Sequence, residues 1–114
     1  MQSESDSRSA KPRITPFDFS QTVMAGERAS VTCMAVGSLP LTFKWMKDGR
    51  PLQESQDTSI TREEDFSLLM LKHLSSSHSG NYSCLVENAL GRDSQSARLS
   101  VRCESSSAVV LWIL

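Results

Sequence analysis

The chain has 114 residues, with twelve Lys and Arg, thirteen Asp and Glu, and a formal net charge of −1. This length provides one modest hydrophobic core and not two, because domains of roughly 100–150 residues are the commonest size. The near-zero charge and the scattered basic residues exclude a field that would gather nucleic acid or anionic membrane over the whole molecule.

In chain order, the first segment is residues 1–11, which are rich in Ser and in charge. The segment lacks the apolar stretch of a secretory signal, so a secreted form would already have lost its signal. We expect residues 1–11 to be disordered, because they offer too little apolar surface to pack.

Short segments of alternating apolar and polar residues follow, separated by turn signals, and helical periodicity is nearly absent. This pattern predicts an all-β sandwich of two antiparallel sheets. Asp48-Gly49 is a tight-turn signal between two of the segments. The predicted strands span residues 13–19 with a break at Pro16, 21–24, 28–36, 41–47, 57–62, 66–72, 81–87 and 92–101.

The last segment, residues 103–114, is predicted to lie outside the domain, which we place at residues 12–102. It ends in the apolar run 108–114, far shorter than the ~18 residues that a membrane-spanning helix needs. We interpret this run as a truncated spanning helix, the first strand of a following domain, or a junction with foreign residues. The chain has three cysteines, an odd number, and we assign no function to the last of them, Cys103.

Three residues on three different predicted strands identify the kind of sandwich. Alternation turns Cys33, Trp45 and Cys84 toward the core, which is the arrangement of an immunoglobulin domain. Tyr82 stands two residues before the second Cys, at the position of the tyrosine corner. The stretch between residues 47 and 57 is too short for two extra strands, so the I-set-like, shorter type is expected. The other core residues singled out are Leu69 and Leu71.

A bond between Cys33 and Cys84 would close a loop of about 50 residues and stabilise the fold by about 4 kcal/mol. Such a bond implies an oxidising compartment. The alternative is that both cysteines stay reduced as buried apolar residues in a cytosolic, muscle-type domain.

No catalytic motif, phosphate loop or metal-ligand spacing occurs, so we predict no enzyme activity, no cofactor and no metal. His73 and His78 are expected to be solvated. Immunoglobulin domains usually carry Asp where this chain has His78, and that Asp pairs with an Arg, for which Arg62 is the candidate. Asn81-Tyr82-Ser83 is a sequon for N-glycosylation.

The register also predicts which side chains point outward on each sheet. One outer face is mostly polar. On the other, Met34, Leu68 and Met70 are expected to cluster, bordered by Phe17 or Phe19, and Met suits adaptable contact surfaces. The alternatives are a register shifted by one residue in 66–72, or coverage by the N-terminal strand. The predicted interface comprises Met34, Leu68, Met70, Thr32, Ser59, Thr61 and Lys72.

Two runs carry a more specific resemblance. Residues 12–19, Pro-Arg-Ile-Thr-Pro-Phe-Asp-Phe, and 38–45, Ser-Leu-Pro-Leu-Thr-Phe-Lys-Trp, resemble variable immunoglobulin domains of the arthropod Dscam family, including its shortened chelicerate members. Members of that family are cell-surface adhesion receptors with alternatively spliced domains, which recognise identical copies through antiparallel pairing of one sheet. The resemblance therefore implies an extracellular, membrane-anchored parent and an identical copy as partner, and the sequon at Asn81 makes a glycoprotein the expectation.

Two other functions remain open on the sequence. One is a structural spacer domain in an intracellular filament protein, which would need neither the disulfide nor an apolar outer face. The other is a receptor domain that binds a different protein ligand. Nucleic acid is not expected as a partner, because most aromatic residues are needed for the core.

Overall fold

The structure, a computed structural model, describes residues 10–19 and 23–103. The predictions for residues 1–9 and for the apolar run 108–114 lie outside the described residues.

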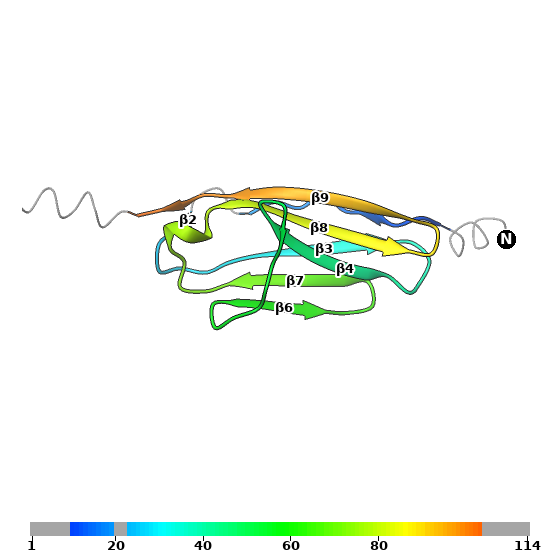
Figure 1. Cartoon of the computed structure of the whole chain (residues 1–114), viewed down its shortest axis with the longest axis horizontal. Helices are drawn as coiled ribbons and strands as arrows, with labels where there is room; N and C mark the ends of the chain where they lie inside the picture. The colour runs from blue at the N-terminus through cyan, green and yellow to red at the C-terminus, as the bar shows by residue number, and fades with distance from the viewer. Residues whose placement is uncertain (1–9, 20–22, 104–114) are drawn as a thin grey trace, which may run out of the picture.

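Two four-stranded antiparallel sheets, of order β1-β3-β7-β6 and β5-β4-β8-β9, stack to form a sandwich, and β10 and β2 form a short parallel pair (Figure 1). One short strand, β5, lies between β4 and β6 in the chain, as the shorter type requires. The elements of the described residues are β1 (Arg13–Ile14), β2 (Val23–Met24), β3 (Ala29–Val36), β4 (Thr42–Lys47), β5 (Arg50–Pro51), β6 (Thr58–Arg62), β7 (Phe66–Leu71), η1 (Ser76–His78), β8 (Gly80–Asn88), β9 (Gly91–Leu99) and β10 (Val101–Arg102).

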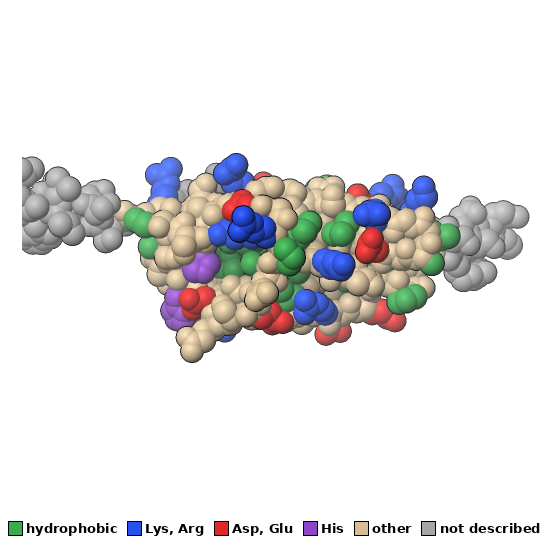
Figure 2. Space-filling view, in the orientation of Figure 1, with side chains coloured by type: hydrophobic (Ala, Val, Ile, Leu, Met, Phe, Trp, Pro, Cys, Tyr) green, Lys and Arg blue, Asp and Glu red, His purple; other side chains and the backbone are tan. Residues whose placement is uncertain are grey.

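The core lies between the two sheets. It is formed by every second side chain of the strands, since buried and exposed residues alternate along them. In β3, buried and exposed residues alternate from Ala29 to Val36 without interruption, because successive side chains of a strand point to opposite faces. On the face that Figure 2 shows, charged side chains are spread over the surface and hydrophobic side chains form a smaller part of it. The buried hydrophobic residues are Ile14, Phe19, Val23, Ala29, Val31, Cys33, Ala35, Phe43, Trp45, Leu69, Leu71, Leu74, Tyr82, Cys84, Val86, Ala97 and Leu99.

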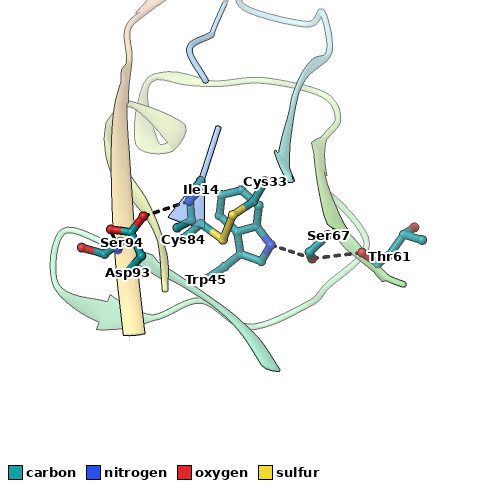
Figure 3. The surroundings of a disulfide bond; sticks show 8 residues. All are labelled: Ile14, Cys33, Trp45, Thr61, Ser67, Cys84, Asp93 and Ser94. Atoms are coloured by element: carbon teal, nitrogen blue, oxygen red, sulfur yellow. Dashed lines mark hydrogen bonds between the residues drawn. A yellow bond between two sulfur atoms is a disulfide. The ribbon is translucent and has the colours of Figure 1, made fainter. Parts of the chain in front are cut away.

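A Cys33–Cys84 disulfide joins β3 of one sheet to β8 of the other, which confirms the predicted immunoglobulin arrangement. Trp45 lies beside it and is 3% exposed (Figure 3). The indole Nε1 donates a hydrogen bond to Ser67 Oγ, and that hydroxyl donates to the carbonyl of Thr61. The only polar atom of the Trp45 side chain therefore has a partner inside the core.

The tyrosine corner is present as predicted. The hydroxyl of Tyr82 donates a 2.5 Å hydrogen bond to the carbonyl of His78. Burial, and to a lesser extent the charge of Asp48, raises the pKa of Tyr82 to about 12. Arg62, the candidate for the Arg that pairs with the usual Asp at this position, does not pair with His78. Arg62 lies 3.7 Å from Glu54, whereas His78 accepts a hydrogen bond from the backbone N of Ser75.

The N-terminal strand is much shorter than predicted. β1 ends at Ile14, and Pro16 cannot extend the pairing because it has no N–H. Further along the chain, Val23–Met24 pairs in parallel with β10. Phe17 and Phe19 do not border the outer face. Phe17 packs against Trp45 and Phe19 against Tyr82, with ring centroids 5.8 and 5.4 Å apart, so both rings join the core.

The side chain of Asn88 forms hydrogen bonds that join the start of the domain to two loops, a role that the sequence did not reveal. Its Nδ2 donates to the carbonyls of Ala10 and Ser38, and its Oδ1 accepts from the backbone N of Leu90 and of Gly91. One side chain thus closes the β8–β9 turn and holds the chain where it enters the sandwich.

Candidate functional site

The candidate site is the outer face of the β1-β3-β7-β6 sheet. Three rows of cross-strand neighbours build it, because the alternate residues of the same strands are buried in the core. The rows are Ser30–Met70–Ser59, Thr32–Leu68–Thr61 and Met34–Phe66. The structure therefore brings together the six predicted strand residues of the interface, with the predicted register, and β1 pairs at the edge of β3 and does not cover them.

Phe66 belongs to this face and was missed by the sequence analysis. It opposes Met34 in the register and is half-buried. Its position, two residues before Leu68 on the same strand, was the signal that could have identified it. We define the methionine face as Met34, Phe66, Leu68 and Met70, of which Met34 is 49% exposed.

The methionine face has opposite charges at its two ends. At the end of Met34 and Phe66, the β6–β7 turn carries Glu63, Glu64 and Asp65, and the backbone N of Ala35 donates to the carbonyl of Asp65. At the other end stand the exposed Arg28 and the half-buried Lys72, next to the pair Ala29–Leu71 that ends the ladder.

His73 follows Lys72 and is not simply solvated. Its side chain is 78% exposed, yet its Nδ1 lies 2.9 Å from Oδ1 of Asp57. The backbone of Asp57 also accepts a hydrogen bond from the N–H of Lys72. These contacts fix the end of β7 against the segment that leads into β6.

A second set of exposed apolar side chains lies near the β8–β9 turn. Leu39 follows Ser38 in the loop bound by Asn88, Leu90 lies in the turn itself, and both are about half exposed. These two leucines stand on loops, in contrast to the ordered strands of the methionine face.

Within residues 10–19 and 23–103, no group of three or more His, Cys, Asp and Glu could hold a metal ion. No described helix is long and apolar enough to cross a membrane. Cys103 is exposed, and Asn81 of the sequon is exposed at the start of β8.

Comparison with known proteins shows which family the chain resembles. The family model "Immunoglobulin I-set domain" matches residues 12–101. The chain is 37% identical over 92 residues to "Cell adhesion molecule DSCAM" of Homo sapiens, and 34% identical over 90 residues to "Myosin light chain kinase, smooth muscle" of Gallus gallus. These alignments cover 80% and 79% of this chain but only 4% and 5% of the relatives, so the chain spans a small part of each relative's length.

Solved structures give the same two groups of relatives. The Dscam1 Ig7 domain, isoform 5, superposes with a TM-score of 0.78 at 32% identity, covering 82% of this chain and 99% of that one. The titin M3 domain superposes with a TM-score of 0.75 at 25% identity and the same coverage. Adhesion molecules and muscle proteins thus both carry domains similar to this chain.

Proposed function

Since the chain belongs to the Immunoglobulin I-set domain family, we propose that it is an extracellular recognition domain of a cell-surface adhesion receptor. It binds an identical copy through the methionine face. The observation that carries the proposal is the ordered, partly exposed apolar cluster of Met34, Phe66, Leu68 and Met70 on a sheet whose other residues alternate regularly between core and solvent.

An apolar centre suits contact between identical copies. In a two-fold pair each copy presents the same surface, so the surface must be complementary to itself. Apolar side chains meet this demand, because they match themselves, and monomeric proteins seldom leave such clusters uncovered. The Thr and Ser residues of the same rows would form the polar rim.

The charges at the two ends of the face supply the orientation. In an antiparallel pair, the acidic turn of one copy lies opposite the end of Lys72 in the other, so unlike charges meet on both sides of the axis. Such flanking pairs contribute more to specificity than to affinity. One domain pair would bury a small area, and we expect micromolar-scale binding, which adhesion tolerates because many copies act together.

The second candidate function is a structural domain of an intracellular filament protein, and the similarity to titin and myosin light chain kinase favours it. The Cys33–Cys84 disulfide weighs against it, because disulfides persist in oxidising compartments and are rare in the cytosol.

Analytical ultracentrifugation of the chain and two matched variants tests the first candidate. Met70→Asp places a charge at the centre of the methionine face, whereas Met46→Asp places the same charge on a half-buried, outward Met of the other sheet. We expect the parent and Met46→Asp to dimerise and Met70→Asp to remain monomeric. A dimeric Met70→Asp with an unchanged melt, or a parent that stays monomeric at millimolar concentration, would contradict the proposal.

A further inference from the structure

The strands of the second sheet, β5-β4-β8-β9, carry far more basic than acidic side chains. Their five basic residues are Lys44, Lys47, Arg50, Arg92 and Arg98, against two acidic ones, Glu87 and Asp93, a difference of +3. Residues 52–65, which join this sheet to β7, carry five acidic residues and one basic, a difference of −4. The strands of the first sheet carry two basic residues, Arg13 and Arg62, and no acidic one, so the acidic residues of 52–65 lie in the connecting segments and not in a strand.

The space-filling view shows where the basic side chains lie. Lys and Arg side chains lie mainly over the upper part of the molecule in Figure 2, where β9, β8 and β4 run in Figure 1. Acidic side chains lie along the lower edge, beside β7 and β6, and some also stand among the basic ones in the upper part. This arrangement leaves the basic sheet available even when the methionine face is occupied.

Few carboxylates compete for the cations of the basic sheet. Glu87 lies 3.9 Å from Arg92. The carboxylate of Asp93 instead accepts hydrogen bonds from the backbone N of Ile14 and of Ser94. For Lys44 and Arg98, both exposed and outward, no ion pair with a described acidic residue is present.

The outward side chains between the cations are chiefly hydroxyls and an amide. Thr42 pairs through Glu87 with Arg92, Lys44 pairs through Leu85 with Ser94, and Asn81 pairs with Arg98. Arg92 and Arg98 lie six residues apart on one strand, which is roughly 20 Å, and Lys44 lies two strands away, about 10 Å. The surface is thus an array of spaced cations with hydrogen-bonding groups among them.

We propose that this cationic face, defined by Lys44, Arg92 and Arg98, binds a sulfated polysaccharide. An extended chain with repeated sulfates offers anions at intervals and hydroxyls between them, which complements the array. Arg forms strong charge-assisted hydrogen bonds with such oxyanions. The outward residues include no aromatic ring on which a nucleic-acid base could stack, and the small apolar centre of Met46 and Leu85 is half-buried.

Heparin is the probe for this proposal. The double variant Lys44→Ser/Arg98→Ser removes two cations of the face, and the matched control Arg13→Ser/Arg28→Ser removes two exposed cations outside it. We expect the parent and the control to be retained on immobilised heparin and the face variant to elute at lower salt, with about tenfold or greater loss of affinity by calorimetry. Binding should weaken steeply with salt, since polyanion contacts release counterions.

Three results would overturn the proposal. Equal losses in both double variants would mean attraction by general charge. Equal competition by hyaluronan, which has carboxylates but no sulfates, would exclude sulfate recognition. Stronger binding to poly-glutamate than to heparin would identify an acidic protein as the partner. At concentrations where the parent is monomeric, Met70→Asp should bind heparin like the parent, so this test is independent of the proposed self-association.

Discussion

Trp45 Nε1 donates a 2.9 Å hydrogen bond to Oγ of Ser67, a side chain that has no exposed surface. Ser67→Ala would leave the buried indole N–H without a partner and also remove the bond to the carbonyl of Thr61. An unsatisfied buried donor costs about 1–3 kcal/mol, so we expect the free energy of unfolding to fall by about that amount in denaturant titrations.

Ser96→Ala is the matched control for this change. Ser96 also makes a side-chain hydrogen bond, to Ser83, but on the solvent side of β9. We expect a change below about 0.5 kcal/mol there. An equal effect of the two substitutions would show that the Trp45–Ser67 hydrogen bond contributes no more to the free energy of unfolding than a hydrogen bond at the surface.

The contact between Trp45 and Ser67 also illustrates what sequence alone could provide. Strand alternation was enough to place Cys33, Trp45 and Cys84 in the core. Side chains of a strand alternate between two faces, so once one face is known to be buried, the side of every residue on that strand follows. It did not reveal the partner of the indole, since Ser67 is 22 residues away and its neighbours give no signal for a buried hydroxyl.

The errors near the N-terminus have a related cause. Alternation over residues 13–19 favours one strand, but the missing N–H of Pro16 ends the pairing early. After Pro16 the β1–β3 pairing no longer holds the chain, and both Phe17 and Phe19 turn their rings toward the core. Likewise, the hydrogen bonds of Asn88 to Ala10 and Ser38 join segments far apart in the sequence, for which a local pattern gives no signal.

Tyr82 makes stability depend on pH in the alkaline range. Its pKa is raised from 10.0 to about 12 in the folded protein, so between pH 10 and 12 the unfolded chain loses a proton that the folded chain keeps. The contribution of this group is fully present below pH 10 and decreases as the pH rises, by about 2–3 kcal/mol in total.

Comparison of the parent with Tyr82→Phe isolates this effect, since other groups titrate equally in both. Tyr82 is the one Tyr of the chain, so its ultraviolet titration can be followed directly. We expect the stability difference between the two proteins to shrink above pH 10. A titration midpoint near 10 in the folded protein would contradict the raised pKa.

Removal of the disulfide distinguishes a domain that depends on oxidation from one that does not. Cys33 and Cys84 are 51 residues apart, and the double substitution Cys33→Ala/Cys84→Ala should lower the free energy of unfolding by about 4 kcal/mol. Non-reducing peptide mapping should yield the Cys33–Cys84 peptide pair, and a link from Cys103 to either residue would be inconsistent with the structure. A parent that melts identically with and without reductant would favour the intracellular candidate.

The proposed antiparallel pairing makes one further prediction, which apolar contact alone would not. Lys72 of each copy should face the acidic turn of the other, so Lys72→Glu and Asp65→Lys should each weaken self-association by placing like charges together twice. A mixture of the two variants restores both pairs, because the two substituted side chains attract each other on one side of the axis and the native Lys72 and Asp65 meet on the other. Ultracentrifugation of the mixture should therefore detect heterodimers at concentrations where each variant alone is monomeric, and raised salt should reduce the difference. Equal association of the mixture and of its separate components would mean that the two ends of the face do not meet.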